Sequence, residues 1–137
     1  MIAKQTTSDY QIKPEEVLSA DEIRDLQGFV KRVPVSDYVA NLAVNLVRAS
    51  RPDDKDSPQF IKDWVSWGAG VRASQNLILG GKARAVLDGR YNVSQEDIKA
   101  LAYPVLRHRI ILNFNAEAEG IGVEDVIGRL LKGSQMI

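Results

Sequence analysis

Apolar residues recur at helical spacing in five stretches of this chain. The clearest stretch follows Ser36, where apolar side chains repeat in the i, i+3, i+4, i+7, i+8 pattern of an amphipathic helix, at Val39, Leu42, Ala43, Leu46 and Val47. The other four helices are predicted to begin after Ser19, near Val71, after Ser94 and after Gly122. The pattern therefore predicts an all-α fold, a bundle of about five helices.

Residues with capping chemistry mark the ends of these helices. Ser19 and Ser94 each precede an acidic residue three positions later, which is the capping-box pattern of a helix N-terminus. Pro34 should stop the first helix, and Gly89 and Gly133 stand where the third and fifth helices should end. The helix boundaries are thus indicated independently of the apolar stripes.

Two segments do not follow the helical pattern. Residues 50–58 have turn-forming composition, which predicts an exposed loop. The stretch near 60–66 is short, aromatic and roughly alternating, so we expect a short extended segment that lies on the helices. Its tryptophans, Trp64 and Trp67, are expected to be packing anchors, with a partner-binding platform as the alternative.

The third helix contains the sequence Gly80-Gly81-Lys82, which resembles the end of a phosphate-binding loop. That loop needs a glycine five residues before its last glycine and a Ser or Thr after the lysine, and this chain has neither. Each glycine inside a helix costs ~1 kcal/mol relative to alanine. We therefore expect a neighbouring helix to approach the backbone closely at Gly80 and Gly81.

The 137 residues suffice for one domain with one core. We interpret residues 1–16 as a flexible arm or a remnant of an upstream domain, residues 17–133 as the helical domain and residues 134–137 as a tail. The first 20 residues contain no run typical of a signal peptide, and no segment approaches the ~20 apolar residues of a membrane span. A cytoplasmic location is expected.

Charge and residue usage exclude several functional classes. The 18 basic residues balance the 18 acidic ones, which disfavours charge-driven binding to nucleic acid or to an anionic membrane. The absence of cysteine excludes disulfides and thiol catalysis, and fits a reducing compartment. One histidine cannot supply the usual nitrogen ligands of zinc, so we predict no metal site.

The first candidate site is the glycine-rich turn Gly68-Ala69-Gly70, which places Arg72 in the first turn of the third helix. A guanidinium can bind phosphate oxygens through two hydrogen bonds, and the exposed N–H groups at a helix N-terminus attract the same anion. The alternative is an arginine that is solvated or paired with a nearby carboxylate.

The second candidate is the cluster Arg107, His108 and Arg109 at the end of the fourth helix, with Arg90 expected near it. Cations at this position complement the negative end of the helix dipole and can donate to the last carbonyl groups. A contact with an anion or with another subunit is the alternative. His108 has no Ser or Cys nucleophile identifiable beside it, so a role as general base is not supported.

The order of these segments resembles the C-terminal helical lid domain of MoxR-family AAA+ ATPases. The lid of that family has a pattern close to Gly-Ala-Ser-Pro-Arg-Ala, and residues 68–73 stand in its place, with Gly70 and Val71 where the family has the Ser-Pro pair. Further similar blocks follow the family order, at residues 46–51, 87–90, 93–98 and 104–110. The resemblance extends from about residue 17 to residue 131.

The resemblance implies a parent chain with an upstream AAA+ core that binds ATP and Mg²⁺, neither of which this fragment should bind alone. It implies that Arg72 is the sensor-2 arginine, which reaches the γ-phosphate and couples ATP hydrolysis to lid rotation, with Gly68, Ala69 and Gly70 beside the nucleotide. Such proteins form rings with chaperone-like roles, so we expect a ring homo-oligomer with a client protein for the parent and an inactive monomer for the fragment.

Two other functions remain open at this stage. A free-standing helical protein-binding or adaptor domain is the main alternative, because an all-α domain without a phosphate-binding loop needs no nucleotide. A helix-turn-helix DNA-binding domain is a more distant one, since it would require a strongly basic helix face, which the best-formed stripe lacks.

Overall fold

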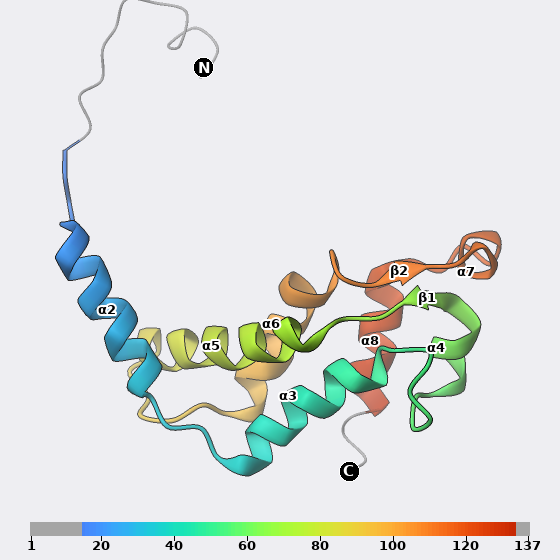
Figure 1. Ribbon diagram of the computed structural model, residues 1–137, viewed down its shortest axis with the longest axis horizontal. Helices are drawn as coiled ribbons and strands as arrows, with labels where there is room; N and C mark the ends of the chain where they lie inside the picture. Colours follow the sequence, from blue (N-terminus) through green and yellow to red (C-terminus); the bar gives the residue numbers. More distant parts are fainter. Residues whose placement is uncertain (1–14, 134–137) are drawn as a thin grey trace, which may run out of the picture.

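A computed structural model describes residues 15–133 of the chain, and this part is predominantly helical (Figure 1). Its helices are α2 (Ala20–Arg32), α3 (Asp37–Ala49), α4 (Gln59–Trp64), α5 (Val71–Leu87), α6 (Gln95–Leu106), α7 (Phe114–Ala118) and α8 (Val123–Gly133). Strands β1 (Val65–Trp67) and β2 (Ile111–Leu112) form a two-stranded antiparallel sheet. The predicted all-α class is confirmed. The arm and the tail, expected at 1–16 and 134–137, lie almost wholly outside the described residues.

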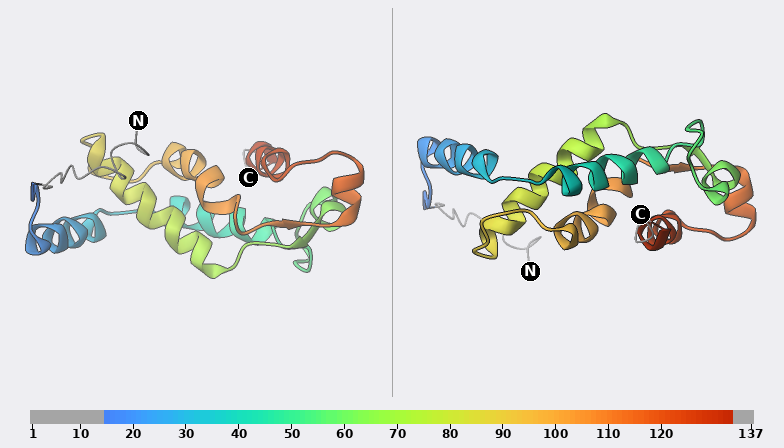
Figure 2. Two further views of the ribbon diagram at one scale, coloured as in Figure 1. Left: turned by 90° about the horizontal axis from the view of Figure 1, so that it is seen from above. Right: turned by 90° about the horizontal axis from the view of Figure 1, so that it is seen from below.

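The core lies where α3, α5, α6 and α8 meet (Figures 1 and 2). Apolar side chains from these helices and from α4 are almost fully buried there, the largest being Ile61, Leu77, Ile98, Leu106 and Ile127. These positions follow the helical spacing of the sequence, which places one face of each helix toward the others. None of the helices in residues 15–133 is long and apolar enough to cross a membrane.

The two glycines inside α5 allow α6 and the segment before it to approach the helix backbone. A Cβ atom on Gly80 would lie 2.9 Å from Leu101 Cδ1, and one on Gly81 would lie 2.9 Å from Val93 Cγ1. Real Cβ atoms do not approach other atoms so closely, so an alanine at either position would force the Leu101 or Val93 side chain to shift. The expected close approach at this glycine pair is confirmed.

The segment near 60–66 begins as a helix rather than as an extended strand. Residues 59–64 form α4, and only 65–67 are extended, pairing with β2. The aromatic residues raise the strand propensity of this stretch, whereas Ile61 and Trp64 have the i, i+3 spacing of a helix and are both buried. The fold also contains α7, a five-residue helix capped by Asn113, which the sequence did not predict.

The two tryptophans have different environments. Trp64 is the expected anchor: its indole N–H donates to Glu119 Oε2 at 3.1 Å, and the Arg129 guanidinium carbon lies 4.3 Å from the centre of its ring. Trp67, by contrast, is 68% exposed. The packing prediction therefore holds for Trp64 and not for Trp67.

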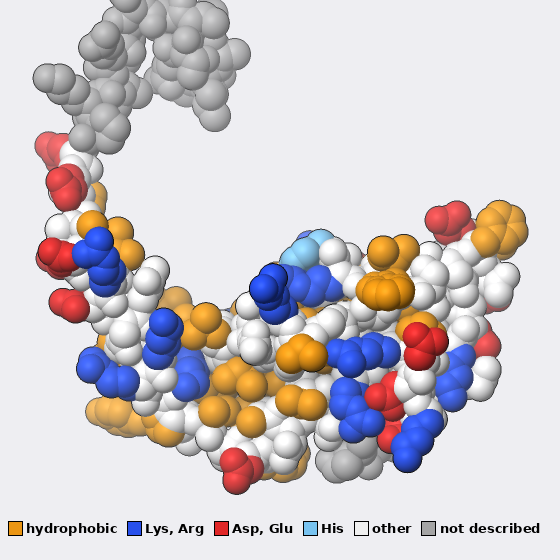
Figure 3. All heavy atoms as spheres, viewed as in Figure 1, with side chains coloured by type: hydrophobic (Ala, Val, Ile, Leu, Met, Phe, Trp, Pro, Cys, Tyr) orange, Lys and Arg blue, Asp and Glu red, His pale blue; other side chains and the backbone are white. Residues whose placement is uncertain are grey.

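Helix α2 extends away from the other helices (Figure 1), and none of its residues is buried. The capping box of Ser19 and Glu22 is formed as the sequence predicted. The apolar face that was expected to pack is half exposed at Ile23, Leu26 and Phe29. Figure 3 shows apolar side chains on this projecting helix. Helix α2 is thus an amphipathic helix whose apolar face is only partly covered, by α5.

Candidate functional site

The glycine turn ends at Gly70, the N-cap residue of α5. Gly70 has extended backbone angles, φ −84° and ψ 175°, and no side chain bonds the N-terminal N–H groups of the helix. The carbonyl of Gly70 accepts the Ala73 N–H at 2.9 Å, which closes the first turn. The start of this 17-residue helix therefore carries the partial positive charge of free N–H groups.

Arg72 is the second residue of α5, and its side chain is exposed. Within residues 15–133 no carboxylate pairs with its guanidinium and no hydrogen bond engages it. Pairing with a nearby carboxylate is thus not observed in the described part of the chain, and the exposed side chain agrees with a solvated arginine. What remains is a free guanidinium next to the positive end of a helix, an arrangement that suits an incoming anion.

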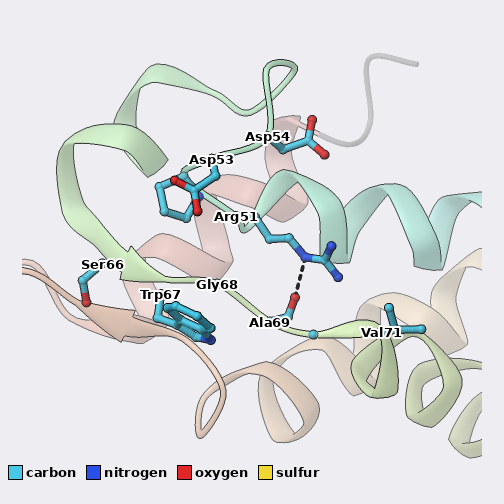
Figure 4. A pocket seen from close by; sticks show the side chains of 10 residues that line it. Arg51, Asp53, Asp54, Ser66, Trp67, Gly68, Ala69 and Val71 are labelled. Carbon is cyan, nitrogen blue, oxygen red and sulfur yellow. Dashed lines mark hydrogen bonds between the residues drawn. The ribbon is translucent and has the colours of Figure 1, made fainter.

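A cleft of about 520 Å³ lies beside the glycine turn, between residues 51–54 after α3 and residues 66–71 (Figure 4). The cations and carboxylates at its edge are Arg51, Asp53 and Asp54, and the exposed Trp67 forms part of its wall. The lining ends at Val71, and Arg72, the next residue, is not part of it. The cleft and the free arginine therefore flank the start of α5 without forming one pocket.

The end of α3 holds the glycine turn in place. The Ser50 hydroxyl accepts the Ala69 N–H at 3.0 Å, and the Arg51 Nε–H donates to the Ala69 carbonyl at 2.8 Å (Figure 4). Neither residue was identified from the sequence as part of the site. The sequence shows only that Ser50 and Arg51 stand at the end of a helix before a loop. It does not reveal that their hydrogen-bond partner lies 18 or 19 residues later.

The second candidate cluster closes the C-terminus of α6. Arg107 Nε donates to the Tyr103 carbonyl at 3.3 Å, and Arg109 Nη1 donates to the Val105 carbonyl at 2.6 Å and also contacts His108 Nε2. Arg107 further pairs with Glu124 of α8 at 3.3 Å. These bonds agree with the capping interpretation, in which cations satisfy the last carbonyl groups of a helix.

The structure brings the two candidate clusters to the same end of the α5–α6 pair. In the antiparallel sheet Trp67 is the partner of Ile111, so the glycine turn that follows Trp67 runs beside the residues that precede Ile111. Figures 1 and 2 show the start of α5 and the end of α6 at this position. Arg72 and the cluster 107–109 therefore lie at the same end of the α5–α6 pair, although they are far apart in the sequence.

Arg90 does not belong to this cluster, contrary to our expectation. It lies at the opposite end of α6, where its Nη1 and Nη2 donate to the two carboxylate oxygens of Asp97 at 2.8 and 2.6 Å. Arg84 and Ser94 also contact Asp97, whose side chain is 1% exposed. The hydrogen bonds from Arg90 are the main cause that lowers the pKa of Asp97 to about 2.

Comparisons with known proteins identify the family of this domain. Residues 61–130 match the family of AAA lid domains. The chain is 31% identical to the chaperone MoxR1 of Mycobacterium tuberculosis over 118 residues, and 28% identical to YeaC, an uncharacterized protein of Bacillus subtilis, over 117 residues. These alignments include 86% and 85% of this chain, but only 31% and 34% of the two relatives.

A solved structure has the same fold. The crystal structure at 2.00 Å of a Cytophaga hutchinsonii protein, named as a candidate ATPase, superposes on this chain with a TM-score of 0.81 and 30% sequence identity. The superposition covers 96% of this chain and 40% of the other. The chain thus spans about a third of the length of its curated relatives. It belongs to the AAA lid domains, and it is a lid of the MoxR type.

Proposed function

We propose that this domain acts on ATP bound by an AAA+ core that precedes it in the same polypeptide. The observation that carries the proposal is the free Arg72 guanidinium in the first turn of α5. By its resemblance to the family, Arg72 is the sensor-2 arginine, which contacts the γ-phosphate and couples ATP hydrolysis to rotation of the lid. Gly68, Ala69 and Gly70 would then lie beside the nucleotide.

The residues of this chain fit a contact to a phosphate, but not a complete nucleotide site. Gly80-Gly81-Lys82 cannot act as a phosphate-binding loop, because both glycines are used in helix packing. Among residues 15–133 no group of three or more acidic or histidine side chains is arranged to hold a metal ion. ATP and Mg²⁺ would therefore be held by the core, where Mg²⁺ neutralises charge that develops on the phosphates. The isolated domain should neither bind ATP tightly nor hydrolyse it.

The parent protein would be a ring-forming, chaperone-like ATPase in the cytoplasm. Its similarity to the chaperone MoxR1 supports the chaperone-like role, and the absence of cysteine fits a reducing compartment. The cluster of Arg107, His108 and Arg109, at the same end of the α5–α6 pair as Arg72, is the candidate for an additional contact with an anion or a neighbouring subunit. The client protein is not specified by any residue of this domain.

A protein-binding or adaptor role is the second candidate, and the exposed apolar face of α2 favours it. The exposed fraction is 53% at Leu26 and 50% at Phe29, and such a face suits a partner surface. The two functions differ in what they require of the gene. An ATPase lid requires a coding sequence upstream with a phosphate-binding loop within about one domain length. An adaptor requires a start signal directly before this segment.

Calorimetry and turnover measurements test the proposed function in solution. The 137-residue chain alone should show no ATP binding in the micromolar range and no turnover above a heat-inactivated control. The full-length protein should hydrolyse ATP, and removal of the lid should lower its turnover. Micromolar ATP binding by the isolated domain, or full turnover without the lid, would contradict the proposal.

A further inference from the structure

Both backbone polar groups of Ala69 are held by side chains at the end of α3. Its N–H donates to Ser50 Oγ at 3.0 Å, and its carbonyl accepts the Arg51 Nε–H at 2.8 Å. Ser50 is fully buried, and its own hydroxyl hydrogen is committed to the Val47 carbonyl at 2.7 Å. The hydroxyl can therefore act only as an acceptor toward Ala69, which fixes the direction of this bond.

Gly68 brings the same two segments into backbone contact. A Cβ atom at this position would lie 2.3 Å from the Ser50 carbonyl oxygen and 2.6 Å from Arg51 Cα. Neither atom belongs to a movable side chain, so any larger residue would push the turn away from α3. Gly70, two residues later, has no atom within 4 Å of a Cβ placed on it. The close approach is thus confined to Gly68.

We propose that Arg51 is a positioning residue for Arg72. Ala69 lies three residues before Arg72, and the chain between them enters the first turn of α5, so fixing the Ala69 peptide fixes where that turn begins. Arg51 bonds the turn only through Nε; within residues 15–133 its terminal nitrogens make no hydrogen bond or ion pair, although its charge also acts on Asp54. This inference rests on the proposed function, in which the Arg72 guanidinium contacts the phosphate and the fixed turn orients it.

The chain contains a matched control for Arg51. Arg48, one turn earlier on α3, forms its ion pairs with Asp54 and Asp56 of the following loop and makes no bond to the glycine turn. Loss of Arg48 should therefore affect that loop alone. Gly68 and Gly70 form a second matched pair, since an added methyl group meets the backbone of α3 at Gly68 and open space at Gly70.

Amide hydrogen exchange of the 137-residue chain tests the geometric part of the proposal. Arg51→Gln should accelerate exchange of the Ala69 amide about fivefold to tenfold, because loss of the bond to the Ala69 carbonyl loosens the turn that holds the Ala69 N–H against Ser50 Oγ. Gly68→Ala should do the same, whereas Arg48→Gln and Gly70→Ala should leave this amide unchanged. Equal exchange of the Ala69 amide in Arg51→Gln and in the unmodified chain would overturn the proposal.

A double-mutant cycle in the full-length ATPase tests the functional part. Arg51→Gln should lower kcat by between about tenfold and 10²-fold, the range expected when a reacting group is displaced by about an ångström. The variant that carries both Arg51→Gln and Arg72→Ala should be no slower, within about twofold, than Arg72→Ala alone. A merely structural role would instead make the two losses multiply and would lower the thermal midpoint.

The outcomes separate this inference from the proposed function. If Arg72→Ala is slow but Arg51→Gln has normal turnover, or if the two losses multiply, the positioning role is wrong and the lid function stands. If Arg72→Ala has normal turnover, the nucleotide contact is wrong. The exchange of the Ala69 amide in Arg51→Gln then decides by itself whether Arg51 positions the turn.

Discussion

Arg90 and Asp97 form a two-point ion pair that joins the turn after α5 to the first turn of α6. The guanidinium nitrogens lie 2.8 and 2.6 Å from the two carboxylate oxygens, and the carboxylate is 1% exposed. Asp97 also accepts from the N–H and hydroxyl of Ser94, which completes the capping box. One buried carboxylate thus fixes both the helix N-terminus and the turn that leads to it.

This pair predicts a loss of stability in acid. The folded-state pKa of Asp97 is about 2, below its ordinary value of 3.8, so its contribution is fully present above pH 4 and disappears as the pH falls toward 2. The free energy of unfolding should decrease by about 1–2 kcal/mol from this group between pH 5 and pH 2.5. Urea unfolding at a series of pH values measures the effect.

Asp97→Asn is the control for the acid prediction. Asparagine keeps an oxygen that can cap the helix but loses the charge, so the variant should be less stable at pH 5 and should lose less of its remaining stability in acid. Hydrogen bonds also lower the pKa values of Glu22 and Asp54, so the free energy of unfolding should still decrease somewhat in acid in both proteins. An equal acid dependence in the variant would show that Asp97 is not the titrating group.

Replacement by alanine should have opposite effects at Gly81 of α5 and at Gly28 of α2. Gly81→Ala should destabilise the protein by about 1–2 kcal/mol, because its methyl group would contact Val93 at 2.9 Å and overpacking outweighs the gain in helix propensity. Gly28 of α2 has open space around it, so Gly28→Ala should increase helicity. Thermal unfolding and far-ultraviolet circular dichroism check the pair. A more stable Gly81→Ala protein would contradict the assigned packing.

The apolar face of α2 should contribute little to the stability of this chain. Leu26 is half exposed, so Leu26→Gln should change the free energy of unfolding by less than about 0.5 kcal/mol. Leu77→Ala, at a fully buried position, should cost about 2–5 kcal/mol. Urea titration of both variants measures the contrast. A large loss for Leu26→Gln would mean that α2 is packed more tightly than the structure shows.

Much of the fold could be predicted because short-range rules determine it. The capping boxes at Ser19 and Ser94 form as expected, and Gly89 adopts the positive φ, 67°, of a helix C-terminus. Gly80 and Gly81 conflict with helix propensity, and that conflict correctly indicated a close neighbour. The caps involve partners within a few residues in the sequence. The glycine pair is itself visible in the sequence, although its packing partners are remote.

The errors arose where the partner is remote in the sequence. The stretch near 60–66 was expected to be extended, yet residues 59–64 form a helix that buries Ile61 and Trp64. The sequence placed Arg90 near the cluster 107–109, but the carboxylate of Asp97 holds it at the other end of α6. Arg51 was overlooked because its bond to Ala69 spans 18 residues. Only tertiary packing reveals such contacts.

Steady-state kinetics of the full-length protein decide whether Arg72 contacts the nucleotide. Arg72→Ala should lower kcat by at least about tenfold and by up to on the order of 10³, because a guanidinium aimed at the γ-phosphate stabilises charge in the transition state. Arg72→Lys should recover part of this loss at most, since lysine lacks the planar fork.

The thermal midpoint must be measured on the same samples, because it separates a catalytic loss from a folding defect. Arg72 is exposed and unpaired within residues 15–133, so its removal should change stability by less than ~1 kcal/mol. A large drop in kcat with an unchanged midpoint is the predicted result. An unchanged kcat for Arg72→Ala, at equal protein and saturating ATP concentrations, would contradict the account.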